Sequence, residues 1–414
     1  MTLVRGSPLF DTKIKIVTTD CDLLILSTQD WDALPTRKHH WARKFAARGN
    51  RVLYVEQQMH WLGWLADLRS QFGRAWRCLY GPRQVSERLW VFTLPLVPPF
   101  FQMFLVINAL NNWFLVPVLR WALRRIGFRD IVLWAYTLHA AGLVGRLGER
   151  LVVYECVDEF SAARGLVRGG TVTALEKQLL HLSDSVIVTH PSLLQSKTVR
   201  DRSPVLVPNG ADVTHFARAG GPAIQPAAAV AALPRPVVGF HGWIQYWIDF
   251  DLIAYAARSH PEWSFALIGP IEPLARVDKV RGLANVHFLG KQPYEHMPEF
   301  LAGFDVCINP FVLDKLADSV SPIKLYEYLA SGKPVVSVDM PAAREFSDMI
   351  ELVRTPEQFV HALEDMLSRE QDRTVAAEAT ARQQAVSSFS WDARFQQVND
   401  LLQEALSERV RVDR

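Results

Sequence analysis

Short runs of β-branched and aliphatic residues alternate with amphipathic stretches along most of the chain. In the first half, the runs expected to form strands are Leu23–Ser27, Arg51–Val55, Leu89–Leu94, Ile131–Trp134, Leu151–Val157, Ser185–Thr189 and Val205–Val207. Helical periodicity occupies the gaps between them, for example over Arg37–Arg48 and Gln102–Ile126. This alternation predicts βαβ units around a largely parallel sheet that is covered on both faces.

A Pro- and Ala-rich segment, Gly220–Pro236, interrupts the alternation and has the composition of a linker. The alternation then resumes, with expected strands at Val237–Phe240, Ser264–Ile268, Val286–Leu289, Asp305–Asn309 and Val335–Val338. Helical patterns occupy the last stretch, Thr355–Leu406. The sequence therefore predicts an α/β protein with two doubly wound, Rossmann-like domains facing a cleft. Ligands are expected in the loops that follow the strands.

Composition excludes several classes of protein. With 414 residues, of which 49% are apolar, the chain can bury sizeable cores and is not disordered. Its 45 basic and 43 acidic side chains leave a net charge of +2, so we expect no nucleic-acid partner. The four cysteines are widely spaced, which disfavours a disulfide framework or a structural zinc site. Because no secretory signal is visible at the start, we expect a cytoplasmic protein.

One short helix has clear start and stop signals. Ser321 and Pro322 are typical of an N-cap and a first helical turn, and Gly332 is typical of a helix end. Lys324 lies in the first turn, where a cation is unfavourable and a bound phosphate would relieve the cost. Glu327 shares its face, so an ordinary surface ion pair is the alternative interpretation.

This helix and its flanks resemble the donor-binding motif of GT-B glycosyltransferases, in particular bacterial enzymes of surface-polysaccharide synthesis of the teichuronic-acid type. Other stretches agree with this family in order and spacing: Pro208–Phe216, Gly239–Gly242, Leu267–Pro270, Asn285–Gly290 and Phe389–Asp392. The resemblance implies an acceptor-binding domain over 1–212 and a nucleotide-sugar-binding domain over 213–390. Residues 391–414 would then form a helix that returns to the N-terminal domain.

The motif and the resemblance together indicate the donor-binding residues. These are Gly239, His241, Gly242, Phe288, Leu289, Ser321, Lys324 and Glu327. By resemblance, Lys324 would contact the donor diphosphate and Glu327 the ribose, while main-chain groups around Phe288–Leu289 would hold the base. Gly239 has an alternative role in helix–strand packing. The donor is expected to be a UDP-linked sugar, which is a co-substrate, and no cofactor is implied.

A candidate catalytic base follows the expected strand that ends at Val157. Asp158 is placed to take the proton of an acceptor hydroxyl group, and its position is similar to that of the catalytic aspartate in the xanthan glucuronosyltransferase. The alternative is that Asp158 caps the following turn, with Glu159 as the reserve base. Many retaining relatives carry a second glutamate eight residues before the position of Glu327, where this chain has Ser319. That difference leaves room for an inverting mechanism.

Two further patterns are explained better by local structure than by ligand binding. Asp249 and Asp251 form the D-x-D of metal-dependent sugar transferases, but helix capping explains Asp249 better, so we expect no metal. His39 and His40 lie in an amphipathic helix and are expected at its surface.

The leading function is transfer of a sugar to a hydroxyl group of a glycan or lipid-linked acceptor. Asp30 and Trp31, in the loop after the first strand, are candidate acceptor contacts. An NAD-type oxidoreductase is disfavoured because no G-x-G-x-x-G follows the first strand. A non-catalytic GT-B relative, acting as a binding or scaffold subunit, remains the alternative function.

Aromatic and basic residues are combined in two regions before residue 130. The stretch Pro95–Leu123 is apolar but interrupted by polar residues, so we expect no membrane span. The two groups are Trp113, Phe114 and Trp121 with Arg120, Arg124, Arg125 and Arg129, and Trp61, Trp64 and Trp76 with Arg69, Arg74 and Arg77. Such helices suit an anionic membrane surface, the alternative being packing on the N-terminal sheet. We favour peripheral contact with the inner face of the cytoplasmic membrane.

Overall fold

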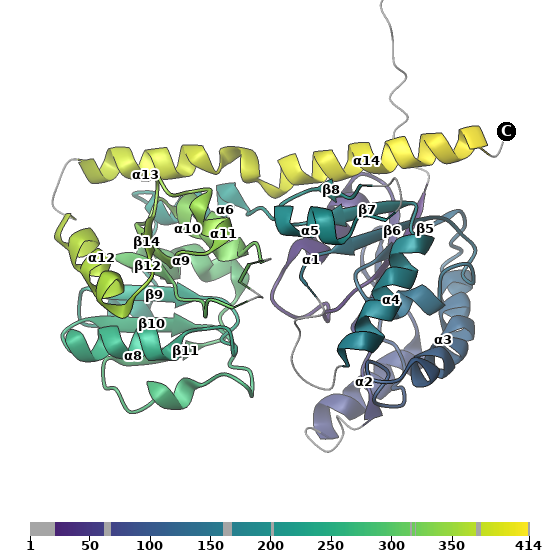
Figure 1. The fold of residues 1–414 in the computed structure, drawn as a ribbon, viewed down its shortest axis with the longest axis horizontal. Coiled ribbons are helices and arrows are strands. Elements are labelled where there is room, and N and C mark those ends of the chain that lie inside the picture. The colour runs from purple at the N-terminus through teal and green to yellow at the C-terminus, as the bar shows by residue number, and fades with distance from the viewer. Residues whose placement is uncertain are drawn as a thin grey trace, which may run out of the picture.

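The computed structural model describes residues 21–61, 68–159, 168–199, 203–314, 317–318, 320–369 and 374–412. Figure 1 shows two α/β halves side by side, with α13 (Thr374–Ala385) and α14 (Trp391–Val412) running along one edge of both. Each half is built on its own, largely parallel sheet. The predicted fold class, two doubly wound α/β domains, is confirmed. The exact domain bounds stay a prediction.

The first sheet has eight strands in the order β3-β4-β2-β1-β5-β6-β7-β8, and only β3 and β4 are antiparallel. The strands are β1 (Asp22–Leu26), β2 (Arg51–Val55), β3 (Arg83–Ser86), β4 (Leu89–Phe92), β5 (Ile131–Ala135), β6 (Glu149–Cys156), β7 (Ser185–Val188) and β8 (Val205–Leu206). Leu24 of β1 lies between Leu53 of β2 and Leu133 of β5. All of β1 is buried because helices cover both faces of the sheet.

Alternate residues of the central strands point to opposite faces of this sheet. Leu24 packs in one core with residues of α3 (Leu105–Arg125) and α4 (Gly169–Leu182), whereas Leu23 packs in another with residues of α1 (Arg37–Ala47) and α14. The remaining helices of this half are α2 (Leu68–Tyr80) and α5 (Pro191–Ser196). Among the described residues, no helix has both the length and the apolarity needed to cross a membrane.

The second sheet has six parallel strands in the order β11-β10-β9-β12-β13-β14. They are β9 (Val237–His241), β10 (Ser264–Ile268), β11 (Val286–Gly290), β12 (Val306–Asn309), β13 (Val335–Val338) and β14 (Glu351–Val353). The helices around it are α8 (Phe250–Ser259), α9 (Met297–Ala302), α10 (Ile323–Ser331), α11 (Pro341–Arg344) and α12 (Pro356–Ser368). This is the strand order of a Rossmann fold, with the reversal between β9 and β12.

The segment predicted to be a linker is partly built into the second core. It follows α6 (Val213–Ala217) and contains α7 (Ala228–Ala231). Val230 of α7 is only 1% exposed, and a Cβ at Gly303 would lie 2.6 Å from its Cγ1. The linker interpretation of the whole segment is therefore wrong, because this apolar side chain is needed in the core.

The last helix, α14, packs on the first sheet and lies far in sequence from its neighbours. Trp391 packs edge-on against Trp41 of α1, at 5.6 Å between ring centroids, and stacks on His40 at 4.6 Å. His39 is fully buried, and its Nδ1 accepts a hydrogen bond of 3.1 Å from the main-chain N–H of Thr36. The predicted surface position of His39 and His40 is therefore wrong, since α14 and the loop after β1 cover this part of α1.

Candidate active site

A cleft of about 640 Å³ lies between the carboxyl edges of the two sheets. The strand order reverses between β1 and β5 in the first sheet, and between β9 and β12 in the second. Open α/β sheets bind ligands at such reversals. The loop after β1, the residues after β6, the turn after β9 and the start of α10 all line the cleft. Both reversal points therefore open onto one space.

The start of α10 differs from the prediction in one detail. The N-cap residue is Pro322, and no described side chain caps the helix. The predicted N-cap role of Ser321 is wrong, because its hydroxyl lies 3.0 Å from the Tyr326 hydroxyl and its carbonyl accepts a 2.7 Å hydrogen bond from Asn209 Nδ2. Gly332 ends the helix with a φ of 77°, as predicted. The uncapped first turn is suited to an anion in the cleft.

Lys324 lies in the first turn of α10 and lines the cleft. Its Nζ is 5.0 Å from the centroid of the Phe311 ring and 5.2 Å from that of Phe240. Within the described part of the chain it forms no hydrogen bond or ion pair, so the surface ion pair with Glu327 is absent. Burial lowers the pKa of Lys324 to about 8, against the opposing charge of Glu327. An ammonium group held on aromatic rings in this way is available to an anionic ligand.

Glu327 and His241 meet in the same part of the cleft. His241 Nε2 lies 3.3 Å from Glu327 Oε2, and both residues line the cleft. Burial, aided by the Lys324 charge, lowers the pKa of His241 to about 3. Burial also raises the pKa of Glu327 to about 8, although Lys324 opposes that shift. The pair presents hydrogen-bonding groups more than charge, which suits a ribose hydroxyl. The ribose contact stays a prediction.

Gly242 and Gly239 have different environments. Gly242 lies in the turn after β9 with a φ of 127°, and a Cβ there would be 3.1 Å from Lys324 Cε. Only glycine takes this conformation without strain. Gly239 lies inside β9, where a Cβ would be 2.0 Å from the Phe304 ring. The packing alternative for Gly239 is therefore supported, because the absent side chain makes room for the ring, and Gly239 lies outside the cleft lining. Its donor contact stays a prediction.

Asp158 follows β6 and lines the cleft on the N-terminal side. Burial raises the pKa of its carboxyl group, and the nearby Lys38 ammonium opposes that shift. Among the described residues its side chain forms no hydrogen bond. Residues 160–167, which follow it and which it would cap, lie outside the described residues, so the turn-capping alternative stays open. Glu159 instead pairs with Lys197 at 3.0 Å, and Lys197 also pairs with Glu176 at 2.8 Å. Asp158 is therefore better placed than Glu159 to accept a proton.

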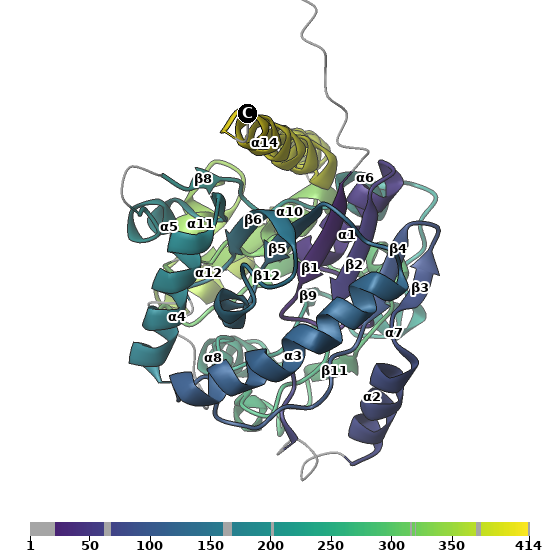
Figure 2. The same ribbon diagram turned by 90° about the vertical axis from the view of Figure 1, so that its right-hand side faces the viewer.

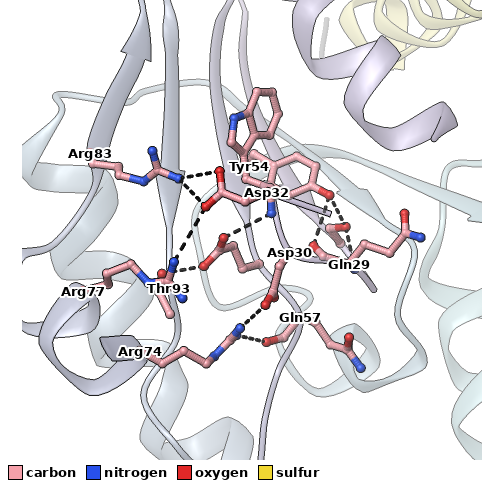
Figure 3. A network of polar contacts seen from close by, with 12 residues as sticks. Gln29, Asp30, Asp32, Tyr54, Gln57, Arg74, Arg77, Arg83 and Thr93 are labelled. Carbon is pink, nitrogen blue, oxygen red and sulfur yellow. Dashed lines mark hydrogen bonds and ion pairs between the residues drawn. The ribbon is translucent and has the colours of Figure 1, made fainter. Parts of the chain in front are cut away.

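Asp30 lies in the loop after β1 and lines the cleft. Figure 3 shows its carboxylate bound to Arg74 of α2, and the next carboxylate, Asp32, held by Arg83 at 3.3 Å and Arg77 at 3.7 Å. Arg74 is buried, so its predicted place at a membrane surface is wrong. These ion pairs hold the loop after β1 in place. The acceptor contact of Asp30 stays a prediction.

Trp31, the other acceptor candidate, has a packing role. Its ring lies 5.1 Å from that of Tyr54 and 5.4 Å from that of His39. Its main-chain N–H donates to Glu56 Oε1 at 3.1 Å, and the Arg43 guanidinium lies 5.0 Å from the ring. These contacts give the half-buried side chain a packing role, and Trp31 is outside the cleft lining. Its acceptor contact stays a prediction.

Phe288 and Leu289 lie in β11 at the edge of the second sheet, half-buried against the core and outside the cleft lining. Gln292 lines the cleft, and its Nε2 donates to the Leu289 carbonyl at 2.6 Å. This contact connects the strand end with the cleft. The predicted contact of the strand with the base stays a prediction.

The D-x-D sequence is explained by local structure. Asp249 caps α8, where its side chain accepts a hydrogen bond of 2.9 Å from the Leu252 N–H, and Asp251 pairs with Lys279 at 2.9 Å. The capping interpretation is confirmed. Among the described residues there is no group of three or more His, Cys, Asp and Glu side chains that could hold a metal ion. Ser319, where retaining relatives carry a glutamate, lies outside the described residues.

Known proteins are similar to this chain in sequence and in structure. Residues 235–369 match the family of Glycosyl transferases group 1. Over 168 residues the chain is 30% identical to TuaH of Bacillus subtilis (strain 168), which is named as a teichuronic acid biosynthesis glycosyltransferase. That match covers 39% of this chain and 42% of TuaH, so the chain spans about two fifths of the relative.

Solved structures are similar over almost the whole chain. Sucrose-phosphate synthase of Thermosynechococcus elongatus has a TM-score of 0.68 at 17% identity, covering 94% of this chain and 100% of that one. HepE of Anabaena, in complex with UDP and glucose, has a TM-score of 0.59 at 16% identity, covering 92% and 98%. At these identities the likeness shows the fold alone. The chain has the GT-B fold, and its residues 235–369 are similar to the group 1 glycosyltransferases.

Sequence reasoning missed part of the N-terminal wall. Arg37 and Lys38 are buried and line the cleft, and Asn209 also lines it. The available signal was the position of two cations in the first turn of a helix that follows the first strand. It is the same signal that indicated Lys324.

Proposed function

We propose that this chain transfers a sugar from a UDP-linked donor to a hydroxyl group of a glycan or lipid-linked acceptor in surface polysaccharide synthesis. One observation carries the proposal: Lys324, in the uncapped first turn of α10, and Asp158, after β6, line the same cleft from different domains. The name of the relative TuaH supports the polysaccharide class. The UDP bound in HepE supports the donor class.

The two walls have complementary chemical roles. Asp158 accepts the proton of the acceptor hydroxyl group while the oxygen attacks the anomeric carbon, as an inverting transfer requires. The bond from that carbon to the diphosphate breaks, and UDP leaves with the electron pair. Lys324 and the first-turn amides of α10 stabilise the charge that develops on the diphosphate. Leaving-group stabilisation is thus assigned to this chain's own groups and not to a metal ion.

The test is UDP release from a panel of UDP-sugars, with glycan and lipid-linked acceptors, by the wild type and by Asp158→Asn. We expect acceptor-dependent release from the wild type and a loss of about 10²–10⁴-fold in the variant. UDP affinity, measured by calorimetry, should be unchanged. A wild type that binds UDP-sugars without turning them over would support the scaffold alternative. Near-normal turnover by Asp158→Asn would remove that residue from the mechanism.

The proposal also includes contact with an anionic membrane through α3, which crosses the face shown in Figure 2. The asparagines of α3 point inward: Asn108 Nδ2 lies 3.0 Å from His139 Nδ1, and Asn112 Nδ2 donates to the His139 carbonyl at 3.1 Å. In the first half of α3 the outward residues include four large apolar side chains, Val106, Leu110, Trp113 and Phe114, with Trp113 74% exposed, and in the second half Arg120, Arg124 and Arg125 are exposed. This inverted polarity favours an apolar partner for the outer face.

Basic charge and a second helix extend this surface. No acidic residue occurs between Glu87 and Asp130. A Cβ at Gly81, just after α2, would lie 2.7 Å from the Trp121 ring, so the end of α2 adjoins α3. Trp76 on α2 is exposed, while Trp64 lies outside the described residues. Exposed aromatics with arginines fit an anionic lipid surface, with the inner face of the cytoplasmic membrane as the proposed location.

A further inference from the structure

Lys38 has surroundings that the proposed reaction does not explain. It lies in the first turn of α1, is 7% exposed and lines the cleft. Its Nζ is 5.3 Å from the centroid of the Tyr136 ring, and within the described part of the chain it has no hydrogen bond or ion pair. Burial lowers the pKa of Lys38 to about 8, opposed by the charges of Asp158 and Glu155. Neither carboxylate forms an ion pair with Lys38 among the described residues, so a bound anion would stabilise this buried ammonium group further.

Glu155 is not available to pair with Lys38, because other groups occupy its carboxylate. Oε1 accepts from Arg37 Nε, and Oε2 accepts from Trp134 Nε1 at 2.7 Å and from the Tyr136 hydroxyl at 2.5 Å. Arg37 Nη1 also donates to the Pro208 carbonyl at 2.8 Å, while Arg37 Nη2 is buried without a described partner. The first turn of α1 therefore brings two cations to the cleft. Glu155 pairs with Arg37 only, and Asp158 is near Lys38 without forming an ion pair with it among the described residues.

Lys38 and Lys324 are counterparts on the two walls of the cleft. Each lies in the first turn of a helix beside the reversal point of its own sheet, and each ammonium group lies over aromatic rings. Neither first turn contains an acidic residue. Cations in these positions are unfavourable for the helix and favourable for a bound anion. The cleft thus has two places suited to anions, of which the donor diphosphate uses one.

We propose that Lys38, supported by Arg37, binds an anionic group of the acceptor, a phosphate or a carboxylate. The inference rests on the proposed function, because it takes Lys324 as the diphosphate site and Asp158 as the base. Lys38 and Asp158 lie on the same wall, so an acceptor anchored through its anion would bring a neighbouring hydroxyl group to the base. Positioning of this kind raises the rate of transfer without adding a reacting group.

The test is calorimetric titration of the full chain, saturated with UDP, with inorganic phosphate in one arm and acetate in the other. We expect wild type to bind at least one of these anions, and Lys38→Met to bind it about tenfold more weakly or worse. Lys38→Arg, which keeps the cation, should stay within about threefold of wild type. The matched control is Lys44→Met, on the same helix but paired with Asp392 at 2.5 Å, and it should bind as wild type does. The preferred anion identifies the acceptor group.

Three outcomes would overturn the inference. One is the absence of anion binding that depends on Lys38, seen either as equal phosphate or acetate affinity in wild type and Lys38→Met or as no anion binding to the UDP-saturated chain. Another is phosphate binding that is lost in Lys324→Met and kept in Lys38→Met, since the anion would then occupy the donor site. A third is phosphate binding kept in Lys38→Met while its transfer activity has an altered pH profile, which would mean that Lys38 acts only through Asp158. If UDP fails to bind but phosphate binding still depends on Lys38, the proposed function fails and the anion site stands.

Discussion

The imidazole Nε2 of His241 lies 3.3 Å from a carboxylate oxygen of Glu327, so the end of β9 and the middle of α10 meet inside the cleft. A second contact reinforces the first, because the main-chain N–H of His241 donates to the Tyr328 hydroxyl at 3.0 Å. Together they fix the start of α10 against the turn at Gly242. A diphosphate bound there would have Lys324, first-turn amides and the turn on adjacent sides.

UDP affinity is expected to fall as the pH rises above about 8. Lys324 attracts the diphosphate only when protonated, and burial lowers its pKa to about 8. Raising the pH through that value removes one positive charge from the site while UDP keeps its negative charges, so the affinity must decrease. Calorimetry between about pH 7 and pH 9 measures the change, with proton uptake on binding at the upper end.

Substitutions of Lys324 separate the effect of its charge on UDP binding from the effect of its shape. Lys324→Met should weaken UDP binding at neutral pH by about 1.5–3 kcal/mol and remove the part of the pH dependence that Lys324 causes, leaving that of Glu327. Lys324→Arg should remove only that same part of the pH dependence and keep the affinity, because guanidinium stays protonated throughout the window. Lys279→Met, a cation of the same domain that pairs with Asp251 away from the cleft, is the control. Unchanged affinity in Lys324→Met would argue against the diphosphate site.

The two glycines of the β9 region should respond differently to alanine. Gly239→Ala forces a Cβ to within 2.0 Å of the Phe304 ring and should lower the free energy of unfolding by about 1–3 kcal/mol. Gly242→Ala places a side chain at a φ of 127°, 3.1 Å from Lys324 Cε, and should reduce UDP affinity in the folded protein. Thermal unfolding and calorimetry of both variants measure this. Loss of UDP binding by folded Gly239→Ala would support the predicted donor contact of that residue instead.

Asp249 should matter for stability and not for metal binding. Asp249→Ala removes the cap of α8 and should lower the free energy of unfolding by about 1 kcal/mol, measured by chemical denaturation. Asp251→Ala breaks only an exposed ion pair and should change it by less than about 0.5 kcal/mol. Neither variant, nor a chelator added to wild type, should alter UDP release. Activity that a chelator abolishes and a divalent cation restores would contradict this assignment.

Flotation with anionic liposomes tests the α3 surface. Wild type should float at low salt, and the double variant Leu110→Ser with Trp113→Ser should stay in the soluble fraction, because it removes exposed apolar area that the fold does not use. Leu274→Ser is the control, since that leucine is 61% exposed on the other half of the chain. Complete recovery of wild type in the soluble fraction would end the membrane proposal.

Most of the fold could be predicted because central parallel strands are continuous apolar runs. The sequence predicts Leu23–Ser27 as a strand, and β1 covers Asp22–Leu26. The exceptions are at the sheet edges. β3, Arg83–Ser86, has mainly exposed side chains and no apolar run. Its sequence therefore does not indicate a strand, although it pairs with β4. β14 has only three residues, too few to distinguish from a loop.

The site was predictable where its signal is local. Lys324 is indicated by its own helix start, whereas a run of basic residues such as Arg37–Lys44 is typical of a solvated helix face. The burial of Arg37 depends on Glu155, which lies 118 positions later in the chain and which no periodicity connects to it. Gly239 lies inside β9 and Gly242 in the turn after it, so their different environments depend on where β9 ends. Patterns in a single sequence locate strand ends only approximately.

The most direct measurement is a crystal structure of the chain with UDP bound. We expect the diphosphate within hydrogen-bonding distance of Lys324 Nζ and of the first-turn amides of α10, with the ribose at Glu327. A nucleotide bound away from residues 321–327 would contradict the assignment of this cleft as the donor site.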